Sequence, residues 1–391
     1  MSILLFDGPE RNHLLPFTFI RPVAQLRVGI DRLQDKWEAA FKEDCSVYTQ
    51  AYLQEKYSPV FSSSNTFVNA SIVPNTELVQ AIEALKIGEQ LVKNDTLIAF
   101  KTEAQNFPED VASYASVVFP KAILHLKSVA DLFLFNATVL TQDFERITQG
   151  RASAPISTTN QVIASQNIFI EEGAKVECAI LNASEGPIYI GKNAEVMEGS
   201  MLRGSIALCD NAMIKMGAKI YGGTTIGPFC KVGGELNNVL LLGYSNKGHD
   251  GFLGNAVVGE WCNIGAATDA SNLKNNYGKL RLWNYNEERF AKTDLQFCGL
   301  MMGDYSRCSI HSTFNTATVV GVCANLFGTG FPRTFLPSFS YGGAQGLKTY
   351  ALDKALEANE AMLARRGVAL SDADVAILKH IFDYSAKWRN N

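Results

Sequence analysis

The sequence predicts two folded parts in series, an α/β domain over residues 1–150 and a parallel β-helix over residues 164–330. In the first part, strand-like segments alternate with helix-like ones, which is typical of a mainly parallel sheet. In the second part, an aliphatic residue recurs at every sixth position. This period fits neither an α-helix nor a half-buried strand, whereas it is typical of a β-helix built from hexapeptide units.

The elements of the α/β domain are short. Strands are expected at residues 3–6, 46–48, 66–68, 97–100 and 116–119, and helices at residues 23–37 and 77–88. The first helix is predicted from apolar residues at helical spacing. The small and polar run 151–163 is interpreted as the linker to the β-helix.

The six-residue repeat is clearest between residues 190 and 232. The successive positions all carry Ile, Leu or Val, namely Ile190, Val196, Leu202, Leu208, Ile214, Ile220, Ile226 and Val232. Apolar residues make up about half of an ordinary chain, so chance would give such a run well under about once in a hundred. These side chains are predicted to point into the coil and to stack from turn to turn.

The repeat is interrupted twice, and these excursions are predicted at residues 235–256 and 269–299. A regular solenoid does not need them, so they are the first place to look for function. The C-terminal extension, residues 331–391, is expected to hold helices at 347–366 and 371–387. These helices are expected to cover the open end of the β-helix or to pack across neighbouring subunits.

Composition excludes several classes of protein. The formal net charge is −4 and there is no basic block, which argues against nucleic acid and anionic membranes as partners. No apolar run reaches the roughly 18 residues that a membrane span needs, and we identify no signal peptide. The eight cysteines are scattered without a Cys-x-x-Cys pair, so we expect a reduced, cytoplasmic protein with no disulfide or zinc framework.

The first excursion carries a candidate catalytic base, His249, within residues 246–254. Imidazole is the side chain best able to remove a proton near pH 7. The second excursion opens with the run 263–268, and lysines on nearby loops could hold a phosphate or an anionic cofactor. A loop histidine bonded to a backbone carbonyl is the alternative interpretation, and the residue pattern alone leaves both open.

The same residues resemble a known family. Its signature around the catalytic histidine reads Ser-Lys-Ala-Gly-His, three residues, Leu-Gly, and then Asn-Ile-Gly-Ala-Gly-Thr. This chain has Ser245-Asn-Lys-Gly-His249, then Leu253-Gly254, and then Asn263-Ile-Gly-Ala-Ala-Thr268. Residues 160–330 thus resemble the bacterial bifunctional UDP-N-acetylglucosamine diphosphorylase / glucosamine-1-phosphate N-acetyltransferase family. The resemblance implies a left-handed β-helix that acetylates glucosamine 1-phosphate from acetyl-CoA, preceded by a sugar-nucleotidyltransferase domain.

The resemblance also implies roles for single residues. His249 is expected to deprotonate the sugar amine, and Asn263 to lie near it. Lys219 corresponds to a basic residue that holds the sugar phosphate, and Lys279 falls near a second substrate lysine, displaced by one inserted residue. Ala266 belongs to the stretch that lines acetyl-CoA on the outside of the coil. Because the family's site forms between subunits, a homotrimer is implied.

Two positions depart from the family's pattern. Phe252 is a substrate-site candidate, but it stands where the family has a tyrosine, and it lacks the hydroxyl. Asn237 stands where the family has a phosphate-binding lysine. Both changes bear on the identity of the sugar more than on the reaction.

The loop after the first strand resembles a divergent branch of the same family. Sugar nucleotidyltransferases usually carry a glycine-rich loop here, whose backbone N–H groups approach the phosphates. This chain keeps one of those glycines, together with the order of basic residues and prolines. The nucleotide-site candidates are Gly8, Arg11, Arg21, Arg27 and Asn69. The domain is shorter than the usual one, which is compatible with a lost activity.

A magnesium site is expected for nucleotidyl transfer, since Mg²⁺ binds few carboxylates together with phosphate oxygens. Asp7, Asp131 and Asp143 are weak candidates for its ligands, because three scattered aspartates are more often helix caps or surface charge.

Three functions remain open at this point. The first is a two-activity enzyme, in which the β-helix acetylates a hexosamine 1-phosphate and the N-terminal domain couples the product to UTP. The second is a non-catalytic trimer that binds a sugar nucleotide. The third keeps the acyl transfer, changes the sugar and leaves the N-terminal domain inactive.

Overall fold

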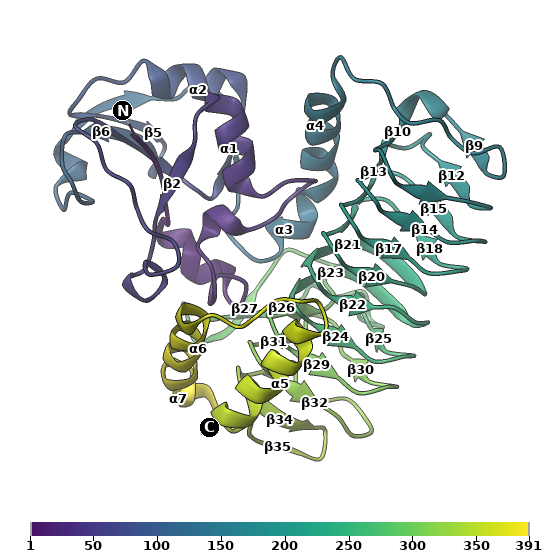
Figure 1. The fold of residues 1–391 in the computed structure, drawn as a ribbon. Helices are drawn as coiled ribbons and strands as arrows, with labels where there is room; N and C mark the ends of the chain where they lie inside the picture. Colours follow the sequence, from purple (N-terminus) through teal and green to yellow (C-terminus); the bar gives the residue numbers. More distant parts are fainter. Residues whose placement is uncertain (1, 390–391) are drawn as a thin grey trace. The chain divides into compact units, whose positions relative to one another are not determined.

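The computed structural model describes residues 2–389 and contains two compact units. The N-terminal unit comprises Met1–Leu26 and Asp31–Ser128. The β-helix unit comprises Arg27–Ile30 and Val129–Asn391, so a short piece of early sequence belongs to it. Figure 1 shows the purple and blue N-terminal unit and the teal, green and yellow β-helix unit. Among the described residues, no helix has the length and apolar character to cross a membrane.

A mixed sheet forms the core of the N-terminal unit. Its strand order is β2 (Cys45–Tyr48), β1 (Ser2–Phe6), β3 (Asn65–Asn69), β6 (Thr96–Thr102), β5 (Glu89–Lys93) and β7 (Ala115–Val118). The predicted strands are confirmed, but β5 was not predicted, and β6 pairs antiparallel with both of its neighbours. Phe67 and Phe100 stack across β3 and β6 with ring centroids 4.7 Å apart, so the aromatic core lies between these strands.

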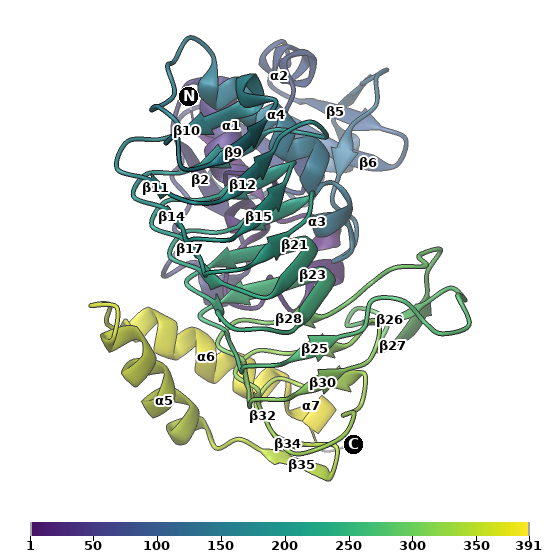
Figure 2. The same ribbon diagram turned by 90° about the vertical axis from the view of Figure 1, so that its right-hand side faces the viewer.

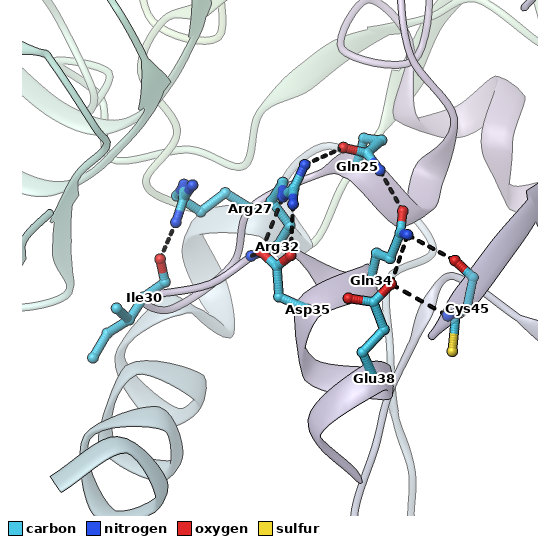
Figure 3. Close-up of polar contacts among 8 residues, drawn as sticks. All are labelled: Gln25, Arg27, Ile30, Arg32, Gln34, Asp35, Glu38 and Cys45. Atoms are coloured by element: carbon cyan, nitrogen blue, oxygen red, sulfur yellow. Dashed lines mark hydrogen bonds and ion pairs between the residues drawn. The ribbon is translucent and has the colours of Figure 1, made fainter. Parts of the chain in front are cut away.

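The predicted helix over residues 23–37 is wrong at its start. Only a 3-10 turn forms at Val23–Gln25, and α1 begins at Leu33 and ends at Phe41. Arg32 is the N-cap: its guanidinium donates to Asp35 at 2.9 and 2.6 Å and to Gln25 at 2.6 Å (Figure 3). The Arg32 backbone N–H also donates to Asp35, at 3.0 Å, which closes a capping box. Local side-chain bonding therefore sets the helix start, later than the apolar spacing suggested.

The other elements of this unit are brief. They are α2 (Thr76–Glu83), the pair β4 (Ile72–Val73) and β8 (Leu124–His125), and 3-10 turns at Pro9–Leu14, Ala51–Leu53 and Val111–Ser113. Helix α2 begins under an Asn75 cap and ends five residues before the predicted end at residue 88.

The β-helix unit is a left-handed coil with three flat faces, named A, B and C in chain order (Figures 1 and 2). Face A contains β10 (Ile168–Ile170), β13 (Ile188–Ile190), β16 (Ile206–Leu208), β19 (Thr224–Ile226), β28 (Met301–Met302), β31 (Val319–Val320), β33 (Phe335–Leu336) and the second halves of β21 (Glu235–Gly243) and β23 (Phe252–Glu260). Face B contains β11 (Lys175–Val176), β14 (Glu195–Val196), β17 (Met213–Ile214), β20 (Lys231–Val232), β22 (Asn246–Lys247), β24 (Asn263–Ile264), β29 (Arg307–Cys308), β32 (Asn325–Leu326) and β34 (Ser340–Gly343). Face C contains β9 (Gln161–Ile163), β12 (Ile180–Asn182), β15 (Met201–Arg203), β18 (Lys219–Ile220), β25 (Asp269–Ala270), β30 (Thr313–Phe314) and the first halves of β21 and β23.

The predicted inward positions are confirmed. The eight aliphatic residues from Ile190 to Val232 are each at most 2% exposed, and they belong to one continuous apolar cluster. Parallel register keeps them stacked, as in the pairing of Ile190 with Leu208 and of Leu208 with Ile226. Burial of this column stabilises the coil by roughly 25 cal/mol for each Å² of apolar surface removed from water.

The two predicted excursions have different outcomes. Residues 235–256 are no loop, because β21 and β23 run along two faces and pair in parallel with each other. The sequence period is broken there because the corners change length. The later excursion is confirmed, and it holds the hairpin of β26 (Arg281–Asn284) and β27 (Arg289–Lys292). The coil also continues beyond residue 330, through β33 and β34.

The C-terminal helices lie along the coil rather than over its end. Strand β35 (Gly346–Thr349) pairs antiparallel with β34 at the end of the coil, where a helix over 347–366 was predicted to begin. Helix α5 (Leu352–Ala364) is held to face B by a 2.6 Å bond from Arg307 to Asn359. Helices α6 (Asp372–Tyr384) and α7 (Ala386–Arg389) follow; Ser371 caps α6 as predicted (Figure 2).

Two helices before residue 150, α3 (Asp131–Leu134) and α4 (Asn136–Thr148), pack on the β-helix. The compact units thus divide after Ser128, earlier than the predicted boundary at residue 150. Buried Asn136 accepts a 2.7 Å bond from the Gly29 N–H and donates to the Gly223 carbonyl at 2.8 Å. These bonds secure residues 27–30 on the coil.

Candidate functional site

His249 lies in the corner between faces B and C, directly after β22. Its side chain is exposed and lines a cavity of about 540 Å³. Asn263 and Ala266 line the same cavity from the next coil, and Asn263 sits beside Asn246 in the parallel ladder. Three residues that the sequence predicted for one site are therefore together.

The cavity is strongly basic. Lys215 and Lys231 come from successive coils, and Arg365 and Arg366 come from the residues after α5; no carboxylate is found among the described lining residues. Arg366 bridges helix and coil, since its Nη2 donates to the Asn246 side chain at 3.3 Å and to the Phe229 carbonyl at 3.4 Å. Burial, together with the neighbouring positive charges, lowers the pKa of Lys231. Crowded cations of this kind favour an anionic ligand.

Aromatic side chains stack at the corner between faces A and B. Phe229, Tyr244 and Trp261 lie in consecutive coils, with centroid separations of 4.9 and 4.4 Å. All three have positive φ, near 59°, 55° and 58°, which bulky residues rarely adopt. The stack compensates for that conformational cost, and Tyr244 and Trp261 form one wall of the cavity.

The remaining β-helix candidates do not line this cavity. Lys219, Glu235 and Phe252 share one column of face C, on the other side of the His249 corner. Lys219 is exposed and lies 3.9 Å from Glu235. Lys279 is in the second excursion, exposed and ion-paired with Asp294. Within one chain the structure thus separates the predicted acyl-donor residues from the predicted phosphate-binding residues.

The N-terminal candidates lie where β1 ends. The Asp7 side chain is 1% exposed; it accepts bonds from the Val23 N–H at 2.8 Å and from Thr49 at 2.5 Å, and its Oδ2 lies 3.4 Å from Arg11 Nε. Arg11 donates to the Thr18 carbonyl at 2.8 Å and to the Tyr52 hydroxyl at 2.6 Å. Burial raises the pKa of Asp7 in spite of the guanidinium. These polar groups hold their own loop together.

Asn69 ends the neighbouring strand β3, beside Gly8. A Cβ added to Gly8 would meet the Asn69 amide at 3.0 Å, so the loop approaches β3 closely. The Asn69 side chain accepts bonds from Ser71 and donates to the Leu97 carbonyl at 3.2 Å. Nearby, Glu10 Oε1 lies 3.0 Å from His125 Nε2. Burial opposes ionisation of Glu10, but its bond with His125 keeps the pKa of Glu10 below the usual value.

Two arginines predicted for the nucleotide site lie in different units. Arg21 is 3% exposed in the N-terminal unit. Arg27 belongs to the β-helix unit, where its side chain donates to the carbonyl of Leu242 at 3.2 Å and to that of Ile30 (Figure 3). Arg27 is therefore bound to backbone carbonyls of its own chain.

The three candidate metal ligands lie in two different units. Asp143 is buried, accepts a 2.8 Å bond from the Ile30 N–H and pairs with Arg146 at 3.1 Å. Asp131 lies in the first turn of α3, in a different unit from Asp7. Across residues 2–389, the acidic, histidine and cysteine side chains form no group of three that could hold a metal ion.

Several residues of the cavity and of the His249 corner escaped prediction, each for a physical reason. Arg365 and Arg366 come from outside the coil, where the hexad pattern has no meaning. Lys247 occupies an inward position but is separated from Val232 by a shortened interval, so the broken period concealed it. The aromatic stack could have been found by the near-regular spacing of bulky residues at left-handed corners.

Comparison with known proteins supports the N-terminal assignment. Residues 3–152 match the family described as sugar nucleotidyl transferase. Among curated proteins, bifunctional protein GlmU of Trichodesmium erythraeum (strain IMS101) is 35% identical over 86 residues, which are 22% of this chain and 18% of that protein. The matched stretch thus spans under a fifth of this relative. The chain is thus similar to a bifunctional GlmU protein over a short stretch, and residues 3–152 match the sugar nucleotidyl transferase family.

Proposed function

We propose that the chain is an enzyme of sugar-nucleotide biosynthesis, whose β-helix transfers an acetyl group from acetyl-CoA to the amine of a hexosamine 1-phosphate, namely glucosamine 1-phosphate. The observation that carries this proposal is the cavity that joins His249 to four cationic side chains. A general base beside a polyanion site is what transfer from a coenzyme A thioester requires.

The chemistry assigned to His249 is proton removal. The imidazole takes a proton from the sugar amine as the nitrogen attacks the thioester carbonyl carbon. A C–N bond forms, the C–S bond of the tetrahedral intermediate breaks, and the imidazolium returns its proton to the departing thiolate. Asn263 exposes an amide on the adjacent coil, where it can donate to an oxygen of the reacting groups.

The cavity residues suit coenzyme A. Its phosphates carry the negative charge that Lys215, Lys231 and the two arginines would neutralise. Ala266 lies among the lining residues and leaves room beside the corner for the thin pantetheine arm.

The sugar is assigned to the face-C side of the corner, where Lys219 and Phe252 lie. Those residues and Lys279 do not line the cavity within one chain, which supports the homotrimer implied by the family resemblance. Phe252 offers an apolar ring without a hydroxyl, so recognition of the sugar rests more on phosphate charge than on that position.

For the N-terminal domain, we propose nucleotidyl transfer from UTP, with Mg²⁺ expected; the match to the sugar nucleotidyl transferase family supports the transfer itself. A specific observation favours a second possibility, a domain that binds a sugar nucleotide without transferring it. Asp7 and Arg11, the groups nearest the glycine loop, are buried and bonded to their own unit.

The acetyl transfer is tested by thiol release from acetyl-CoA with glucosamine 1-phosphate, wild type beside His249→Ala. We expect turnover to fall roughly 10²- to 10⁴-fold in the variant, with binding of both substrates retained. A fall in turnover of less than about tenfold would show that His249 is not the general base. Absence of release with any hexosamine phosphate would leave the coil as a trimer scaffold.

The nucleotidyl transfer is tested separately. Pyrophosphate release is measured with UTP, N-acetylglucosamine 1-phosphate and Mg²⁺. Release that depends on all three supports a two-activity enzyme. UDP-sugar binding by calorimetry without any release supports the non-catalytic domain.

A further inference from the structure

Lys247 occupies a position where the β-helix otherwise places an aliphatic side chain. In register it follows Val232 of the preceding coil and precedes Ile264 of the next, and both of these point into the core. Lys247 itself is 0% exposed. A lysine is almost never fully buried unless its ammonium group is satisfied, so its surroundings require an explanation.

The ammonium group is fully used. Lys247 Nζ donates to the carbonyls of Gly233 at 3.2 Å, of Asp250 at 3.0 Å and of His249. Three N–H donors thus meet three backbone acceptors, which is the full capacity of an ammonium group. Two of those acceptors belong to the corner that carries the His249 side chain.

The corner needs such a partner because its length changes from one coil to the next. Between Val232 and Glu235 the chain has two residues, 233–234, whereas between the matching positions Lys247 and Phe252 it has four, 248–251. Backbone hydrogen bonds flank the mismatch, from the Gly233 N–H to the Lys247 carbonyl at 2.7 Å and from the Glu235 N–H to the Gly251 carbonyl at 3.1 Å. Between them, the carbonyls of His249 and Asp250 accept from the Lys247 ammonium group. Carbonyls that face the coil interior are costly without donors, and Lys247 supplies a donor to those of Gly233 and His249; the Asp250 carbonyl also accepts from the Ala267 N–H at 2.9 Å.

We propose that Lys247 is the positioning residue of His249: it anchors the carbonyls of the four-residue corner from inside the coil, above a shortened one, and so fixes the direction of the imidazole into the cavity. This inference deepens the proposed acetyl transfer and, for its catalytic part, rests on it. Lys247 does not touch the cavity and has no role in binding substrate.

The cost of burying this group indicates that it is retained for more than coil stability. Burial lowers the pKa of Lys247 to about 8, although the carboxylates of Asp250 and Asp269 and the thiol of Cys308 oppose the shift. Valine or isoleucine would complete the inward column without that penalty, as they do in the coils on both sides. Lys247 therefore stabilises the conformation of the corner and not the apolar core.

The experiment compares Lys247→Met with wild type by amide hydrogen exchange and by acetyl-transfer kinetics. Methionine keeps the length and fits an aliphatic column, while it removes all three donors. We expect protection of amides 248–252 to fall by about tenfold or more, while amides 213–226 keep theirs. We also expect kcat to fall roughly 10- to 100-fold with KM for acetyl-CoA within about twofold, because a small misplacement of a base costs turnover.

Two further variants complete the test. Lys175→Met places the same substitution at an exposed position of face B and is expected to change neither measurement. Lys247→Gln keeps two N–H donors and is expected to give intermediate values, and it also serves if the methionine variant does not fold.

The outcomes separate this inference from the proposed function. Wild-type protection of residues 248–252 in Lys247→Met, or an unchanged kcat, would overturn the positioning role. Loss of protection spread equally over every coil would also overturn it, since Lys247 would then be a core residue only. If the wild-type protein transfers no acetyl group, the local exchange result still decides the role of Lys247, and only the proposed reaction is lost.

Discussion

The His249 corner and the loop from Asp7 to Arg11 both resemble sites of the same enzyme family, but they use their charged side chains differently. In the loop, the Asp7 carboxylate and the Arg11 guanidinium are buried and bonded within the N-terminal unit. In the corner, His249 is exposed, and the cations around it face a cavity. The charged groups of the corner are therefore open to a ligand, whereas those of the loop are enclosed, even though Glu10 Oε2 and Arg11 Nε have no hydrogen-bond partner there among the described residues.

This difference shows what a matched motif leaves undetermined. A side chain that binds a ligand must keep donors, acceptors or charge that its own fold does not consume. The order of residues in the loop is preserved, yet those residues now stabilise the loop. The corner instead satisfies its backbone from inside, through Lys247, and leaves its outer side chains for chemistry.

The largest expected effect is on the free energy of unfolding, which a substitution in the loop should lower much more than one in the corner. Arg11→Met leaves the Asp7 carboxylate buried without its cation, so the free energy of unfolding of the N-terminal unit should fall by about 3–5 kcal/mol. His249→Ala should change stability by no more than about 0.5 kcal/mol, because an exposed side chain is removed. Chemical denaturation of both variants measures this. An Arg11→Met protein of unchanged stability that has lost nucleotidyl transfer would show that the loop is a site after all.

An intermediate effect is expected at the cavity. The double change of Arg365 and Arg366 to Ala removes two cations that we assign to the coenzyme A phosphates, so the dissociation constant should rise roughly 10- to 100-fold. Calorimetric titration with coenzyme A at two salt concentrations tests this, since the wild-type affinity should also fall with salt. Lys192→Ala, on an exposed residue outside the described cavity lining, is the control. Equal affinity of wild type and both variants for coenzyme A would show that coenzyme A does not bind at this cavity.

The smallest effect concerns pH. The folded-state pKa of Lys247 is about 8, below the 10.5 of an unperturbed lysine, so the unfolded chain binds more protons between these values. The group therefore lowers stability at neutral pH, and this penalty is relieved as pH rises through 8 towards 10.5. The difference in unfolding free energy between wild type and Lys247→Met should shift by about 1 kcal/mol in favour of wild type from pH 7 to pH 9. A difference that is flat with pH would mean that Lys247 keeps an ordinary pKa.

Much of the β-helix could be predicted, because one inward residue in six is a dense and repetitive signal. Its shortened corner could not, since the two residues after Val232 break the period that reveals the coil. The helix expected at residues 23–37 failed for a related reason. Apolar spacing reports burial, but Ile30 is buried against the coil and not within a helix.

Only part of the cavity lining could be predicted from the sequence. His249, Asn263 and Ala266 were found through a motif whose spacing is fixed by adjacent coils. Arg365 and Arg366 are brought to it by a helix that returns along the coil, and Arg366 contacts Asn246 across 120 residues of sequence. Contacts between such distant segments follow from packing, and no local pattern records them.

The membership of residues 27–30 in the β-helix unit has a consequence for the order in which the chain can fold as it is synthesised. Gly29 bonds to Asn136 and to Thr225, which lies 196 residues further along. Domains commonly fold from the N-terminus as they emerge from the ribosome. Residues 27–30, by contrast, cannot reach their native contacts until the coil residues that bond to them, up to Thr225, have been synthesised.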